Sequence, residues 1–493
     1  MNSKVINLIL VILTAFFVGA ALFFNYIIPI LAVLLLWAII LSLKRFFVES
    51  TLIFLMIYMP FDHFVLTHLP EGFFFYMKYL STGLVFLISF IMFCKNWKKI
   101  NLLRMTPGIY FMIAYIMVAL VSAALNRTGL SMTIISLQQE FRYVPLFLAL
   151  SISHFEERFI RMAVKTILVL GAINILAGLA QLCIGQYVNP LLVQRSVMVD
   201  NQLVFTGTGQ FVQDRGLIFS FFPHYNVFGA YLTIIFILSV SMREFNVFRG
   251  MLIRIMPILA YSTLIFTVSR SSIIGASFGY LIFLWIVKRK KAIPAIVVFI
   301  IVIIVLLVIG NEANIFTERP QELPFFHRLI EAFSPSSWHT MKSYGRLALL
   351  ELTVKTITSS SRLLFGLGPG QWGNLLVWGT PDKGIASTLA FPFNIMDRVL
   401  LADMNWASIL GQFGVLGLFS FVMFLLLVAL YNLKKSRSPS TESYLPQAMS
   451  MAAFIILVAI SAESFFGPWF AARPIAFHLW LLAGFAVSLN LHK

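Results

Sequence analysis

Four arginines, two at the ends of apolar runs and two in a long polar stretch, have the chemistry to bind a charged lipid headgroup. Arg215 lies in DRGLIFSFFPHYNVFG and Arg270 in TVSRSSIIG, while Arg346 and Arg362 flank a stretch of mixed character. A guanidinium group stays protonated and can hold phosphate through two parallel hydrogen bonds. Arginines also anchor at the membrane surface without any ligand, so each residue alone leaves both interpretations open.

A glycine-rich run, FGLGPG, follows Arg362. Glycines let backbone amides approach an anion, which makes Gly368 and Gly370 candidates to bind a diphosphate. The same residue types also form plain turns. Two further cations are candidates for the same site. Lys78 lies about two turns inside an apolar run, where it either has a functional role or extends its ammonium group outward to the membrane surface. Arg142 either pairs locally with Glu140 or belongs to the same site.

The elements that must position these residues are membrane helices. Of 493 residues, 60% are apolar and 11% are charged. The apolar runs are about 17 to 25 residues long, which is the length of an α-helix that crosses a bilayer. We therefore expect an all-α polytopic membrane protein. The net charge of +17 comes from short clusters between apolar runs, and this pattern excludes a nucleic-acid-binding domain.

Basic clusters recur after every second apolar run, which predicts about 14 spans with both termini in the cytoplasm. The expected spans are 6–23, 27–43, 49–66, 72–94, 106–125, 139–155, 164–185, 217–241, 252–269, 271–287, 292–310, 405–432, 445–463 and 471–489. The third is expected to be bent or half-inserted, because Pro60, Asp62 and His63 interrupt it.

Three segments follow from this scheme. Residues 1–310 hold helices 1–11 with a smaller outer loop at 186–216, residues 311–404 form one large periplasmic or extracellular loop, and residues 405–493 hold helices 12–14. The large loop carries eight Lys/Arg and eight Asp/Glu, and SYGRLALLE within it predicts a short helix led by Arg346.

Cofactor chemistry is not indicated. The eight histidines are scattered, Cys94 and Cys183 are far apart in the sequence, and no nucleotide-binding fingerprint occurs. We therefore expect neither a metal nor a cofactor.

Taken in order, four stretches resemble the O-antigen ligase and polymerase superfamily of bacterial envelope glycan assembly. They are RGLIFSFFPHYNVFG with Asn226 and Gly229, TVSRSSIIG, GRLALLELTVKTITSSSRLLFGLGPGQWG, and DMNWASILGQFGVLGLFSF from Asp403. The resemblance implies a GT-C-like, metal-independent glycosyltransferase in the bacterial inner membrane. Its active site would face the periplasm and use an undecaprenyl-diphosphate-linked oligosaccharide as donor.

Arg215 and Arg346 would then stabilise the leaving diphosphate, and Asp403 would accept the proton of the attacking sugar hydroxyl or else pair with Arg398. Ligases carry a histidine where Asp403 stands, which favours the polymerase branch. The residues expected to bind diphosphate or glycan are Lys78, Arg142, Asn226, Arg270, Arg362, Gly368 and Gly370.

The expected partners are the lipid-linked oligosaccharide and membrane lipid, with a polysaccharide chain-length regulator and a flippase as further candidates. Three alternatives remain. A ligase would join finished glycan to lipid A core or protein, a glycan or small-anion transporter would show related halves, and a scaffold would leave the outer arginines unexplained.

Overall fold

The computed structural model describes residues 47–68, 71–98, 106–192, 196–199, 202–205, 218–290, 293–294, 297, 346–372, 404–438 and 443–491. These residues are almost entirely helical, and seven helical segments among them are long and apolar enough to cross a membrane. The expectation of an all-helical, multi-pass membrane protein is confirmed. The count of 14 spans stays a prediction, because the expected spans at 6–23, 27–43 and most of 292–310 lie outside the described residues.

Seven segments meet the length and hydropathy of a span. They are the stretch Phe47–Leu66, the stretch Glu157–Gly185 of α9 (Glu157–Leu192), α11 (Tyr225–Glu244), α13 (Arg270–Val287), α19 (Asn405–Ser436), α20 (Leu445–Glu463) and α21 (Arg473–Leu491). Shorter apolar helices are the part Ser81–Lys95 of α5 (Glu71–Lys95), α6 (Ile109–Leu125) and α12 (Met251–Phe266). A hairpin of β1 (Ser196–Val199) and β2 (Gln202–Phe205), paired antiparallel, lies within the predicted smaller outer loop.

The first described span is bent, as its sequence predicts. Helix α3 (Phe47–Tyr58) passes through a 3-10 turn, Met59–Phe61, into α4 (Asp62–His68). Pro60 stands at the start of that turn, where its missing N–H removes a helical hydrogen bond. Asp62 consequently begins a new helix instead of lying in the middle of a long one.

The predicted span at 139–155 is divided. Helix α7 (Leu130–Phe141) ends three residues into it, and α8 (Val144–Ile152) begins with Pro145 in its first turn. At about 1.5 Å per residue, the nine residues of α8 are too short to cross a bilayer. Every residue of α8 is buried except Pro145, so this short helix is enclosed by its neighbours.

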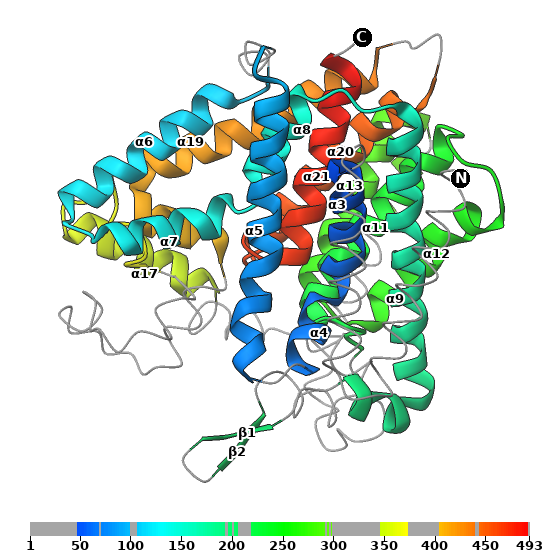
Figure 1. The fold of residues 1–493 in the computed structure, drawn as a ribbon, viewed down its shortest axis with the longest axis horizontal. Coiled ribbons are helices and arrows are strands. Elements are labelled where there is room, and N and C mark those ends of the chain that lie inside the picture. The colour runs from blue at the N-terminus through cyan, green and yellow to red at the C-terminus, as the bar shows by residue number, and fades with distance from the viewer. Residues whose placement is uncertain are drawn as a thin grey trace.

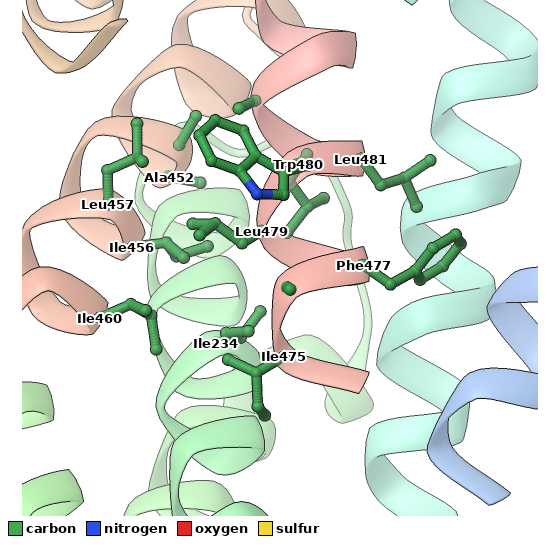
Figure 2. Close-up of a cluster of buried hydrophobic side chains, with 14 of the residues drawn as sticks. Ile234, Ala452, Ile456, Leu457, Ile460, Ile475, Phe477, Leu479, Trp480 and Leu481 are labelled. Atoms are coloured by element: carbon green, nitrogen blue, oxygen red, sulfur yellow. The ribbon is translucent and has the colours of Figure 1, made fainter. Parts of the chain in front are cut away.

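The core lies where α8, α11, α20 and α21 meet. Figure 2 shows Leu479 and Trp480 of α21 near Ile456 of α20 and Ile234 of α11, all with at most 1% of their surface exposed. Trp480 also stacks on Phe424 of α19 with ring centroids 5.4 Å apart. Helices that are apolar all round, as these are, belong in the interior of a helical bundle.

A second unit extends from this core. In Figure 1, α6 and α19 run side by side away from the bundle, with α7 and α17 (Arg346–Ser359) near their far ends. Helix α17 confirms the short helix expected from SYGRLALLE. The residues that follow it in the chain reach α19, and this crossing is the main feature of the candidate site.

Candidate functional site

Helix α19 is broken at Gly414, and the chain after α17 crosses it there. Gly414 has φ +66° and ψ −166°, a backbone conformation that only glycine adopts readily. The amide of Val415 donates to the Leu363 carbonyl at 2.9 Å, and the amide of Leu367 donates to the Gly411 carbonyl at 2.8 Å. The break therefore frees backbone groups of α19 to hold the residues after α17.

A single side chain, Gln412, organises this crossing. Its Oε1 accepts hydrogen bonds from Ser136 Oγ of α7 at 2.6 Å and from the Gly370 amide at 2.7 Å. Its Nε2 donates to Ser408 Oγ at 2.9 Å. Gln412 is 1% exposed, so these bonds satisfy an amide that is buried among apolar neighbours.

The backbone of Gln412 is also used. Its carbonyl accepts from Ser122 Oγ of α6 and from the Gly368 amide, both at 3.0 Å. We call this group the Gln412 cluster, and its members are Ser122, Asn126, Ser136, Arg362, Gly366–Gly370, Ser408 and Gln412. The amides of Gly368 and Gly370 thus bind α19 in this structure, so both glycines serve the turn and its attachment.

Glycines are required where the loop touches its neighbours. Gly366 has φ +70° and lies so close to α19 that a Cβ there would stand 2.6 Å from the Gln412 carbonyl oxygen. Gly368 has φ +108°, and a Cβ there would stand 3.0 Å from Cβ of Asn126. The glycine-rich run is thus shaped to fit between α6 and α19.

Arg362 is tied to the same cluster. Its Nη1 donates to Oδ1 of Asn126, the residue that follows α6. Asn126 in turn donates to the Gly366 carbonyl at 3.1 Å and to the Ser122 carbonyl at 2.8 Å. Because a guanidinium group carries five N–H donors, one bond to Asn126 orients Arg362 and leaves capacity for an anion. The side chain is half-buried.

Helix α17 is attached to α19 by Trp372, which is 2% exposed. Its indole N–H donates to Thr353 Oγ1 of α17 at 3.0 Å, and its ring lies against Gly411 of α19. This packing fixes the helix that begins with Arg346 relative to Arg362. Only the backbone of Arg346 is described.

Several buried oxygens near the cluster have no hydrogen-bond partner. They include Oγ1 of Thr128, which lies beside Gly368, Oε2 of Glu140, one helical turn after Ser136 on α7, and Oδ1 of Asn405, the first residue of α19. Glu140 is 7% exposed and Asn405 is 2% exposed. Polar atoms left unpaired in the interior are costly, and they are found where function requires them.

Asn226 and Arg270 begin two helices in contact. The amide of Asn226 donates to Nδ1 of His224, the N-cap residue of α11. Arg270 is the first residue of α13, and Gly229 of α11 lies against Ser269 and Ser272. The structure therefore brings these two predicted residues to adjoining helix starts.

A buried ion pair forms a further polar group. Asp62 of α4 and Arg473 of α21 pair at 2.8 Å, with 6% and 16% of their side chains exposed. Tyr143, which follows Arg142 in the chain, lies against Phe477 of α21, with ring centroids 5.7 Å apart. Of the predicted residues, Arg142 thus stands at the joint between α7 and α8, with a buried Nε that has no partner.

The remaining predicted site residues are described only in part or lie outside the described residues. Lys78 lies in α5, but its side chain is outside the described part of the chain, as are Arg215 and Asp403 entirely. Arg362 contacts α6, whereas Arg270 begins a helix packed on α11 and α20. Their convergence with Arg215, Arg346 and Asp403 in one pocket stays a prediction.

The two ends of the bundle differ in charge. At one end, Trp406 of α19 donates to the Ser461 carbonyl of α20 at 3.2 Å. The last residue of α20, Glu463, accepts from Ser272 near the start of α13, and Asp62 pairs with Arg473, the first residue of α21. At the other end, Arg161 contacts the Val247 carbonyl and Ser443, and Lys288 pairs with Glu244. Lys434, Lys435 and Arg437 also lie there, at the end of α19.

Comparison with known families identifies one match. Residues 255–422 match the family model described as O-antigen ligase, a stretch that contains Arg270, α17, the glycine-rich loop and the broken part of α19. Comparison with curated proteins finds no match. The family match covers three of the four stretches whose order suggested the resemblance, and it supports the resemblance to the O-antigen ligase and polymerase superfamily.

Proposed function

We propose that this protein is a polymerase of bacterial surface polysaccharide. It transfers a glycan from an undecaprenyl diphosphate carrier to a sugar hydroxyl of another lipid-linked repeat unit. The observation that carries the proposal is the Gln412 cluster, which holds a half-buried arginine inside the stretch that matches the O-antigen ligase family. Membership of this superfamily implies a glycosyltransferase-like activity.

The proposed transfer reaction requires fixed positive charge beside the leaving diphosphate. When the glycan departs, the carrier keeps its diphosphate, and negative charge develops on the leaving oxygen. Arginines held rigidly before the reaction stabilise that charge without reorganising. Arg362 has such support from Asn126, whose amide is itself bound to Gly366 and Ser122.

The acceptor step needs a base. In the proposed reaction Asp403 removes the proton from the attacking hydroxyl, directly before Met404 and the buried start of α19. An aspartate at this position, in place of the histidine of ligases, favours the polymerase over the ligase.

The charged ends of the bundle support the proposed orientation. Cationic residues are retained in the cytoplasm, so the end with Arg161, Lys288 and Lys434 faces inward. The end with Arg270, Asp62 and Arg473 then faces the periplasm, where lipid-linked repeat units are assembled into chains.

The test is reconstitution. Purified protein in lipid nanodiscs is incubated with a synthetic undecaprenyl diphosphate repeat unit, and products are separated by length. A ladder of products supports the polymerase, and transfer of intact glycan to added lipid A core supports the ligase instead. If no glycan is transferred from a matched donor, both the polymerase and the ligase proposals are refuted.

Arginine variants test the site within that assay. Arg362→Ala should abolish laddering while membrane insertion stays normal. Arg437→Ala, an exposed arginine at the other end of α19, should keep wild-type laddering.

A further inference from the structure

Glu463, the last residue of α20, is a carboxylic acid enclosed entirely by helices. None of its surface is exposed. Its Oε2 accepts a hydrogen bond from Ser272 Oγ of α13 at 3.0 Å, while Oε1 has no hydrogen-bond partner. An ionisable group is costly to bury inside a membrane protein, so such a residue is a candidate for a functional role.

Two glycines make room for this residue. A Cβ at Gly275 of α13 would stand 2.6 Å from Glu463 Oε1 and 2.9 Å from its Cδ. A Cβ at Gly229 of α11 would stand 2.8 Å from Cβ of Ser269 and 2.9 Å from Oγ of Ser272. Helices α11, α13 and α20 therefore approach most closely around the Glu463 carboxyl and the serines before it.

A chain of hydrogen bonds leads from Glu463 into the turn before Arg270. Ser269 Oγ donates to Ser272 Oγ at 2.9 Å, and Ser272 donates to Glu463. The Ser269 amide donates to Thr267 Oγ1 at 3.2 Å. Thr267, Ser269 and Ser272 are completely buried, so water does not compete for these hydrogen bonds.

The turn itself is strained. Val268 has φ +56°, and a β-branched residue rarely adopts the left-handed region. Such a conformation persists only where its surroundings over-determine it. Here the surroundings are the hydroxyls of Thr267 and Ser269, together with the Glu463 carboxyl that accepts from Ser272. Their hydrogen bonds hold the turn in this conformation.

We propose that Glu463 is a positioning residue for the transfer reaction. Through Ser272 and Ser269 it fixes the strained turn Thr267–Ser269, and the turn sets where the Arg270 guanidinium meets the anionic leaving group. This inference rests on the proposed function. Because a packing residue such as leucine would join three helices at lower cost, stability alone does not account for an acid here.

The experiment measures kcat and donor KM on the full chain in nanodiscs with the synthetic undecaprenyl diphosphate repeat unit. Glu463→Gln keeps a carbonyl that accepts from Ser272, so it should stay within about threefold of wild type. Glu463→Leu and Ser272→Ala should lower kcat/KM about 10- to 100-fold, the size expected for misplacing a reacting partner. Ser488→Ala is the control. It removes a buried 2.6 Å hydrogen bond from α21 to the Ser153 carbonyl, away from the turn, and should keep wild-type kinetics.

A double-mutant cycle separates positioning from packing. If Glu463 acts through Arg270, then Ser272→Ala combined with Arg270→Ala should be no slower than Arg270→Ala alone. If the double variant loses as much activity as the two single losses multiplied together, the inference is overturned. Full activity of Glu463→Leu or of Ser272→Ala would overturn it too.

The two proposals fail differently. An inactive Arg270→Ala with a fully active Ser272→Ala overturns the positioning role and leaves the transferase standing. A wild-type protein that transfers nothing from a matched donor overturns both. Ser272→Ala removes one oxygen atom, so it keeps the test decisive if Glu463→Leu fails to fold.

Discussion

At the scale of the residue, the most connected side chain of the site carries no charge. Gln412 joins α7, the glycine-rich loop and its own helix through three hydrogen bonds. Sequence reasoning found Arg362, Gly368 and Gly370 beside it, because charge and glycine runs are visible in a sequence. A glutamine inside the apolar run ILGQFGVLG is visible too, and a polar residue in a membrane span is the signal that could have identified it.

Replacing Gln412 by methionine keeps the volume and removes all three bonds. The Gly370 amide and the Ser136 hydroxyl would then lose their buried acceptor, so the variant should lose about 1–3 kcal/mol of stability and most transferase activity. Thermal unfolding in detergent and the ladder assay measure both. Gln447→Met, at the cationic end of α20, should change stability by less than about 0.5 kcal/mol. Equal behaviour of the two variants would contradict the role assigned to Gln412.

The buried pair Asp62–Arg473 yields a second prediction at this scale. Asp62→Asn removes the buried carboxylate that pairs with Arg473 and should cost about 3–5 kcal/mol in thermal unfolding. The double variant Asp62→Leu, Arg473→Met buries no charge and should recover most of that loss. A double variant as unstable as the single one would show that packing, not charge, dominates at this position.

At the scale of the element, hydropathy was sufficient to locate most helices, and local backbone chemistry decided how they differ from plain spans. Pro60 predicted the bend of the first described span. Helix α7 was missed because SLQQEF breaks the apolar pattern, and the span predicted at 139–155 ran across Pro145. The break of α19 at Gly414 could not be seen, because the glycine stands in a continuous apolar run and its φ depends on the loop that crosses it.

Gly414→Ala tests whether that break is required. Its backbone region is nearly closed to residues with a Cβ, and the new methyl group would meet the Leu364 carbonyl and the Gly366 amide. We expect a stability loss of at least about 1–3 kcal/mol, with loss of activity, measured by thermal unfolding and laddering. Gly83→Ala in α5 meets no atom within 4 Å and should be neutral or slightly stabilising. A Gly414→Ala protein with normal stability would refute a fixed break.

At the scale of the whole molecule, the charge distribution and the family match support the same arrangement. The stretch that matches the O-antigen ligase family contains Arg270, Arg362 and Gln412, and Arg270 begins its helix at the end of the bundle opposite the lysines. Positive-inside alternation was readable from the sequence, since it depends only on where lysines and arginines fall. The contacts that tie Arg362 to α6 were not, because they join residues more than two hundred positions apart.

The proposed orientation can be tested on one helix. Helix α20 has 19 residues and spans about 28 Å, with exposed Ser438 before its start and exposed Phe465 just after its end. In a background without Cys94 and Cys183, a membrane-impermeant maleimide applied to intact spheroplasts should label Phe465→Cys. It should label Ser438→Cys only after the membrane is opened. The reverse pattern would place the Glu463 and Arg270 end in the cytoplasm, and a periplasmic transferase site at that end could not then be maintained.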